Sequence, residues 1–97
     1  DPASGPLVSV RQESDRGGTA VLVYTEYARR TFARVTAMLD ELGLNIVDAR
    51  ITPTADDHSL DSYHVLENDG SPIDDLERAQ QIDQALVKAL LKDDGRL

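Results

Sequence analysis

The chain has 97 residues, a formal net charge of −8 and no cysteine. This length supports one domain with a single core, and so acidic a surface disfavours binding to nucleic acid or to an anionic membrane. The absence of cysteine excludes disulfides and thiolate metal sites and is compatible with the cytoplasm. No apolar run approaches the ~20 residues that span a bilayer. Because the first residue is Asp1 and not methionine, we expect a domain taken from a longer protein.

Two strands are expected near the N-terminus. Residues 1–6 contain Pro, Ser and Gly and predict a flexible lead-in. Residues 7–11 alternate loosely and are rich in valine, which indicates a short strand. Residues 14–18 have the composition of a turn, with glycines that accept positive φ. Residues 19–24 are apolar at nearly every position, which predicts a strand buried on both faces at the centre of its sheet.

The next segment has the periodicity of a helix. Its apolar residues are spaced to form one stripe, at Phe32, Val35, Leu39 and Leu42. Gly43 follows at the position where helices commonly end with a left-handed residue. We therefore predict a helix that stops at Gly43 and packs through this stripe.

Two further strands are predicted at residues 45–52 and 59–66, on either side of a polar turn. Alternation in the first strand gives one face with Val47, Ala49 and Ile51 and another with Asp48 and Arg50. In the second strand, one face carries Asp61, Tyr63 and Val65, and the other carries Leu60, Ser62, His64 and Leu66.

A second helix begins after residue 74. Asp74 as N-cap and Glu77 three residues later have the spacing of a capping box, and the acidic Asp75 suits the first turn. The buried stripe of this helix is expected at Ala79, Ile82, Leu86 and Ala89 or Leu90.

The predicted order is ββαββα, an α+β fold with one four-stranded antiparallel sheet and two helices on one face. We expect the N-terminal strand to hairpin onto residues 19–24 and to form one edge of the sheet. The ordered core should run over residues 7–91, with a tail at 92–97. The other sheet face carries enough apolar surface, including Leu60 and Leu66, to suggest packing against a partner sheet.

Two segments resemble a known family. L-G-L-N-I-V-D-A-R-I at residues 42–51 and S-L-D-S-Y-x-V-L-E-x-D-G-x-P-I-D at residues 59–74 resemble ACT domains, small amino-acid-sensing modules. The similarity is greatest to the ACT modules of PII uridylyltransferases, and it runs from about Pro6 to Leu91. The R-G-G-T segment at residues 16–19 and the L-N-I-V-D-A-R-I strand at residues 44–51 look like those of the first of two tandem modules. ACT domains normally read βαββαβ, so here the N-terminal strand would replace the usual last strand in a ferredoxin-like sheet.

The resemblance implies a regulatory role. In that family two ACT modules follow a nucleotidyltransferase domain and a phosphohydrolase domain, and glutamine favours removal of UMP from the PII nitrogen signal protein. The expected ligand is therefore glutamine or another small amino acid. The expected partners are a second ACT module or a second copy through the open sheet face, and PII through the whole enzyme. The fragment itself would carry no catalytic residue and no cofactor, although the whole enzyme uses Mg.

The resemblance also implies the ligand site. An Asn in a G-x-N-I segment often contacts the ligand in ACT domains, and the helix N-terminus after the first central strand faces the ligand carboxylate. The implied ligand-binding residues are Tyr27, Ala28, Arg29, Arg30, Thr31, Asn45, Ile46 and Asp48. Tyr27, Arg29 and Arg30 depart from the family pattern at the positions of its Asp, Pro and small or aromatic residues. The two arginines could hold a carboxylate or simply be solvated.

Some of these residues also have an ordinary structural explanation. Asn45 after a glycine is also common in turns, and Asp48 with Arg50 suits an ordinary surface ion pair. His58 and His64 lack a third ligand at metal spacing.

Two other functions compete with amino-acid sensing. One is a ligand-free ACT module for dimerisation or interdomain contact. The other is an acylphosphatase-like enzyme, which would use Arg29 or Arg30 and Asn45 but would need a glycine-rich phosphate loop that residues 19–42 do not provide.

Overall fold

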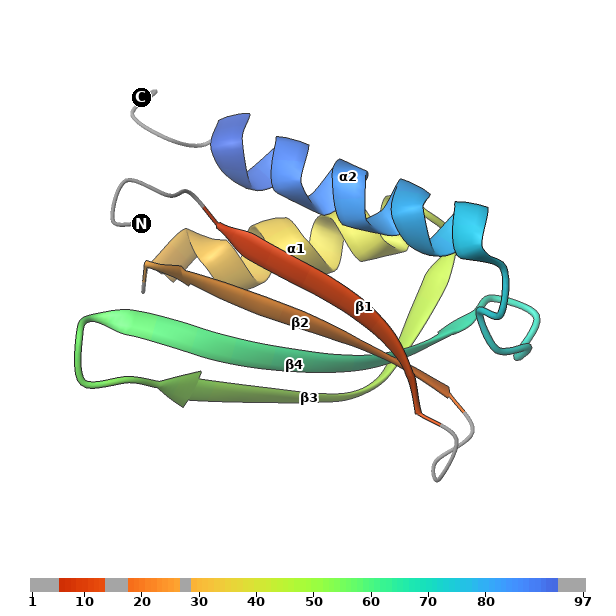
Figure 1. Cartoon of the computed structure of the whole chain (residues 1–97), viewed down its shortest axis with the longest axis horizontal. Coiled ribbons are helices and arrows are strands. Elements are labelled where there is room, and N and C mark those ends of the chain that lie inside the picture. Colours follow the sequence, from red (N-terminus) through yellow and green to blue (C-terminus); the bar gives the residue numbers. More distant parts are fainter. Residues whose placement is uncertain (1–5, 14–17, 27–28, 93–97) are drawn as a thin grey trace.

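The fold is an α+β arrangement of one sheet and two helices. A computed structural model describes residues 6–13, 18–26 and 29–92. Its elements, in chain order, are β1 (Leu7–Glu13), β2 (Gly18–Glu26), α1 (Arg29–Glu41), β3 (Leu44–Pro53), β4 (His58–Glu67) and α2 (Leu76–Lys92). Both helices lie on the same side of the sheet (Figure 1). The predicted ββαββα order and the ferredoxin-like architecture are confirmed.

The sheet has the strand order β1-β2-β4-β3, and every neighbouring pair is antiparallel. The N-terminal strand pairs with β2 from Leu7, opposite Tyr24, to Glu13, opposite Gly18. The prediction that this strand forms one edge of the sheet is therefore confirmed. The predicted lead-in, the turn before Gly18 and the C-terminal tail fall largely outside the described residues.

The central position of β2 accounts for its composition. Four successive residues of this strand, Gly18 to Val21, are buried, so both of its faces are covered. Strands β1 and β4 flank it and satisfy both of its hydrogen-bonding edges. The continuous apolar run predicted a central strand, and the structure confirms it.

The core lies between the helices and the sheet. Its fully buried side chains come from both layers and include Val21, Val23, Val35, Leu39, Tyr63, Val65, Ile82 and Leu86. The stripe predicted for α1 holds at its centre, whereas Phe32 at its start is 47% exposed and contacts Tyr63 through ring centroids 6.1 Å apart. Gly43 ends the helix at φ 81°, as expected for a left-handed stop.

The start of α2 differs from the prediction. The N-cap is Asp75 and not Asp74, because the carboxylate of Asp75 accepts the N–H of Glu77 at 3.2 Å and its carbonyl accepts the N–H of Ala79 at 3.0 Å. Ile73 explains the difference. Its side chain is 3% exposed, and its carbonyl accepts a hydrogen bond from the Gln12 amide at 2.9 Å. Ile73 is thus anchored to the sheet, and the helix begins two residues after Asp74.

Strand β3 forms the other edge of the sheet and is poorly covered. Only Leu44 of its ten residues is buried. Helix α2 packs against β1, and in Figure 1 β3 lies at the lower margin of the sheet, away from α2. Val47 is 59% exposed and Ile51 is 41% exposed. No described helix is both long and apolar enough to span a membrane.

Candidate functional site

The predicted ligand site has two halves: an asparagine half (Asn45, Ile46 and Asp48) and a helix half at the start of α1. The asparagine half lies where β3 begins. The N–H of Gly43 donates to the carbonyl of Asp40 at 3.0 Å, and the Gly43 carbonyl accepts the N–H of Asn68 at 3.0 Å. The chain then turns into β3, where the buried Leu44 anchors the strand and Asn45 is exposed. The Gly43-Leu44-Asn45 segment therefore leaves the amide side chain of Asn45 exposed to solvent at the start of the edge strand β3.

A β-bulge determines which face Asn45 occupies. Ile46 pairs with Val65, and Asp48 pairs with the next residue, His64, so Val47 is one extra residue in β3. Directly paired residues of antiparallel strands share a face. Asn45, paired with Leu66, thus lies on the open face with Asp48. Strict alternation would have separated these two side chains, so the sequence pattern alone did not reveal that they share a face.

The helix half of the site lies at the opposite end of the sheet. Tyr27 and Ala28 are outside the described residues, and Arg29 and Arg30 are the first two residues of α1. Thr31, in the same first turn, is half-buried. The thirteen residues of α1 correspond to a length of about 20 Å.

The strand register agrees with this separation. Glu26, just before the helix half, pairs with His58 at the start of β4, whereas Asn45 pairs with Leu66 near its end. A single copy therefore does not bring Asn45, Ile46 and Asp48 together with the start of α1.

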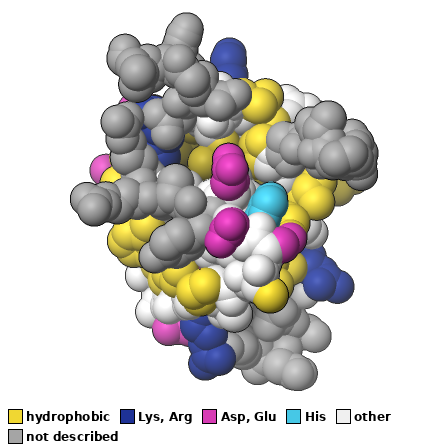
Figure 2. Space-filling view, turned by 90° about the vertical axis from the view of Figure 1, so that its left-hand side faces the viewer, with side chains coloured by type: hydrophobic (Ala, Val, Ile, Leu, Met, Phe, Trp, Pro, Cys, Tyr) yellow, Lys and Arg dark blue, Asp and Glu magenta, His cyan; other side chains and the backbone are white. Residues whose placement is uncertain are grey.

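A polar cluster that the sequence did not reveal lies at the same end as the start of α1. The Tyr24 hydroxyl donates to Asp56 Oδ2 at 2.8 Å, and the Thr54 hydroxyl donates to Asp56 Oδ1. The rings of Tyr24 and His58 are stacked, with centroids 4.9 Å apart. The hydrogen bonds from Thr54 and Tyr24 lower the pKa of Asp56 to about 2. In the end-on view, acidic side chains gather beside a histidine at this end of the molecule (Figure 2).

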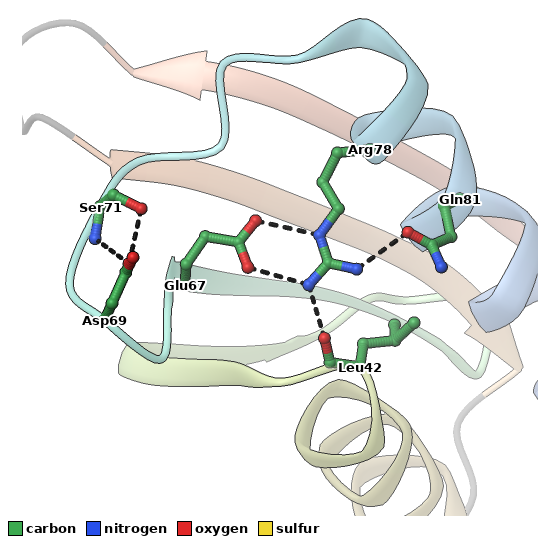
Figure 3. Close-up of polar contacts among 6 residues, drawn as sticks. All are labelled: Leu42, Glu67, Asp69, Ser71, Arg78 and Gln81. Atoms are coloured by element: carbon green, nitrogen blue, oxygen red, sulfur yellow. Dashed lines mark hydrogen bonds and ion pairs between the residues drawn. The ribbon is translucent and has the colours of Figure 1, made fainter.

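A second unpredicted cluster joins three elements at the opposite end. Arg78 of α2 donates from Nε and Nη2 to the two carboxylate oxygens of Glu67, at 2.9 Å each (Figure 3). Nη2 also donates to the Leu42 carbonyl at 2.5 Å, and Nη1 donates to Gln81 at 2.9 Å. The hydrogen bonds with Glu67 raise the pKa of Arg78. A cation beside the carbonyl that ends α1 also suits the helix dipole.

A groove of about 460 Å³ opens beside this clamp. It is lined by Leu42, Gly43, Glu67, Asn68, Asp69, Ser71 and Arg78. Asn45 does not line it, although it lies two residues after Gly43 in the sequence. Arg78 already directs its guanidinium to Glu67, Leu42 and Gln81, so the cluster holds the fold together rather than offering a vacant anion site.

Two buried polar groups lie on opposite sides of β4. On the helix side, the hydroxyls of Ser59 and Tyr63 donate to the 2%-exposed Asp61, and burial raises the pKa of Tyr63. On the open side, His64 is 9% exposed and its ring lies against Gly18. Within residues 6–13, 18–26 and 29–92, no three His, Asp or Glu side chains gather in a way that could hold a metal ion.

Comparison with known proteins gives relatives of one kind. No known family profile matches the chain, and no solved structure matches it. The chain is 42% identical to the bifunctional uridylyltransferase/uridylyl-removing enzyme of Stutzerimonas stutzeri over 99% of its own length, which is 11% of that enzyme. It is 40% identical to the enzyme of the same name from Pseudomonas savastanoi over 93% of its length, and 41% identical to that from Pseudomonas entomophila over 90%. In both, the match spans 10% of the enzyme. Over almost all of its length, the chain is thus homologous to one domain-sized part of the bifunctional uridylyltransferase/uridylyl-removing enzymes.

Proposed function

We propose that this chain is a regulatory ACT module that senses glutamine and thereby controls uridylylation and deuridylylation of the PII nitrogen signal protein in the cytoplasm. The observation that carries the proposal is the similarity to uridylyltransferases over 90–99% of the chain but only 10–11% of those enzymes. A module of that size can bind an effector and pass its bound state to the domains that perform the chemistry.

The chemistry of the two half-sites suits an amino acid. The amide of Asn45 both donates and accepts hydrogen bonds, which matches the side-chain amide of glutamine. The carboxylate of Asp48, on the same sheet face, would attract the ligand ammonium group. The N-terminus of α1, near Thr31, is a favourable position for the ligand carboxylate. Because one copy keeps these halves at opposite ends of the sheet, the complete site requires two modules to meet.

The ligand-free alternative is favoured by a different observation. The β3 margin exposes apolar side chains, including Val47 and Ile51, and such a surface suits contact with another protein domain. In this alternative, the module would only join domains and would bind no amino acid. An acylphosphatase-like site is disfavoured because Arg29 and Arg30 begin α1, whereas Asn45 follows its far end.

Calorimetric titration with glutamine tests the proposal. Replacing Asn45 by alanine should weaken glutamine binding by about 1–3 kcal/mol, because a ligand group would be left without its hydrogen-bond partner. Gln84→Ala, which removes an exposed amide on α2, is the matched control and should bind like the wild type. The titrations should use both the chain itself and a longer protein that includes the neighbouring domains. Equal affinity for the wild type and Asn45→Ala would remove Asn45 from the site. Absence of glutamine binding by both the chain itself and the longer protein would favour the ligand-free module.

A further inference from the structure

A buried carboxylate that belongs to neither half of the predicted site lies beneath the start of α1. Asp61 of β4 is 2% exposed, and its neighbours on the same sheet face, Ser59 and Tyr63, are also buried. Helix α1 starts at the end of the sheet where β2 ends and β4 begins (Figure 1). Phe32, in the first turn of α1, stacks on Tyr63 with ring centroids 6.1 Å apart. Polar side chains are thus buried under the first turn of α1, in a layer that is otherwise apolar.

The hydrogen bonds to Asp61 leave part of its capacity unused. The Ser59 hydroxyl donates to Oδ1, whereas the Tyr63 hydroxyl approaches Oδ2 only to 3.5 Å. Burial and the charge of Asp61 raise the pKa of Tyr63, so this hydroxyl keeps its proton and remains a donor. A carboxylate has about four sites that accept hydrogen bonds. The two hydroxyls therefore leave room for a further donor, above all at Oδ2.

The charge of Asp61 also lacks a counterpart. Among the side chains that the structure describes, no cation forms an ion pair with Asp61. Burying a carboxylate without a cation is costly, because the charge loses its hydration and gains no opposite charge in return. Departures from the rules of core packing are expected mainly at functional sites. Asp61 therefore has the properties of a residue that is kept for a cationic group from outside the chain.

The carboxylate lies close to the protein surface in spite of its burial. Ile51 of β3 pairs directly with Asp61 and is 41% exposed, and paired side chains of this kind begin about 4.5–5.5 Å apart. On the helix side, Phe32 is 47% exposed. A change of rotamer at Ile51 or Phe32 would thus open a short path from solvent to Asp61.

We propose that Asp61 binds the α-ammonium group of the amino-acid ligand. The proposal rests on the proposed function and deepens it, because it adds an anionic contact to the helix half of the site. An ammonium group carries three donors and a positive charge, so it supplies both the hydrogen bond and the counter-charge that Asp61 lacks. The ligand carboxylate would lie beside it, at the N-terminus of α1. Asp48, on the open face, would attract the ligand without touching its ammonium group.

Calorimetric titration with two ligands tests the contact. One is glutamine, and the other is its deaminated analogue, in which hydrogen replaces the α-ammonium group. Asp61→Asn keeps the shape of the side chain and removes its charge. It should weaken glutamine binding at least about 10-fold and change the affinity for the analogue less than about 3-fold, because only glutamine has the ammonium group. Asp83→Asn, which removes a charge from the middle of α2, is the matched control and should change neither affinity.

Unfolding without ligand gives an independent test. If Asp61 is kept for a ligand, its charge costs stability in the empty protein. Asp61→Asn should therefore raise the urea midpoint of unfolding, whereas Asp83→Asn should leave it nearly unchanged. Ser59→Ala disturbs the same buried cluster but keeps the carboxylate. It should retain the difference in affinity between glutamine and the analogue, even with a lower midpoint.

The outcomes separate this contact from the proposed function. Glutamine binding that Asp61→Asn leaves unchanged, or weakens equally for both ligands, would overturn the contact and leave glutamine sensing intact. A selective loss in Asp48→Asn and not in Asp61→Asn would assign the ammonium group to Asp48. An unchanged or lower urea midpoint of Asp61→Asn would show that the fold tolerates or needs the charge, and would also overturn the contact. A wild type that binds no glutamine, as the chain itself and within a longer protein, would refute the proposed function and the contact together.

Discussion

Both carboxylate oxygens of Glu67 accept hydrogen bonds from the guanidinium of Arg78, at 2.9 Å each. The side chain of Arg78 is only 22% exposed and that of Glu67 only 25%. Arg78 also reaches the carbonyl of Leu42, so one side chain connects α2 to the end of β4 and to the turn that ends α1. This contact holds the turn from which Asn45 emerges.

Replacing Arg78 by alanine should therefore destabilise the fold. The change leaves the Glu67 carboxylate and the Leu42 carbonyl without their donor, and the expected loss in the free energy of unfolding is about 1–3 kcal/mol. Urea denaturation measures it. Arg78→Lys keeps the charge but cannot form the paired contact, so it should recover only part of the loss. Full stability of Arg78→Ala would show that the clamp contributes nothing to the fold.

The imidazole of His64 requires a glycine beneath it. A Cβ at Gly18 would lie 2.6 Å from Nε2 of His64 and 2.9 Å from Cδ2. Gly18→Ala should therefore destabilise the protein by about 1–3 kcal/mol, the usual range for an overpacked site. Shortening the histidine to alanine should relieve the clash, so the double variant should lose less than the sum of the single losses. Strict additivity in urea unfolding would contradict this contact.

Acid should weaken the turn between β3 and β4. The pKa of Asp56 is about 2 in the folded protein and 3.8 ordinarily. The folded state thus binds this proton less tightly than the unfolded chain. The resulting stabilisation is fully present above about pH 4 and is lost as the pH falls through about 2. The stability difference between the wild type and Asp56→Asn should be constant at neutral pH and should shrink only within this acid window.

Tyr24→Phe provides the control for this titration. It removes one of the hydroxyls that donate to Asp56, so the pKa of Asp56 should move upward toward 3.8, as NMR titration of the carboxyl carbon would detect. If the stability difference disappeared at neutral pH, or if Tyr24→Phe left the titration unchanged, the assignment of these hydrogen bonds would be wrong.

Local patterns predicted most of the fold. The continuous apolar run of residues 19–24 gave the central strand, and Gly43 gave the end of α1, because burial and backbone conformation act on neighbouring residues. These signals need only a few residues of sequence. The edge position of β1 followed from the element order, since an antiparallel hairpin onto β2 was the simplest connection.

The site was less predictable because its contacts join distant parts of the chain. Tyr24 and Asp56 are 32 positions apart, and Arg78 and Leu42 are 36 apart. The bulge at Val47 leaves no mark in the alternation of residues 45–52, yet it sets the face of Asn45. The separation of Asn45 from the start of α1 likewise follows from strand direction, which a motif does not encode.

The N-cap of α2 offers a direct comparison between two adjacent aspartates. Asp74 and Asp75 are both exposed near the helix N-terminus, so removing either charge should forfeit a similar interaction with the helix dipole. Only Asp75 accepts the N–H of Glu77, at 3.2 Å. Asp75→Ala should therefore lower the free energy of unfolding by about 0.5–2 kcal/mol, and Asp74→Ala by clearly less. The difference between the two variants isolates the capping hydrogen bond from the charge.

Thermal unfolding at matched pH measures the stability of both variants. Asp75→Ser, which retains a side-chain acceptor, should recover most of the loss. Equal losses for the two alanine variants, or a larger loss at Asp74, would return the cap to Asp74 as the sequence pattern had predicted.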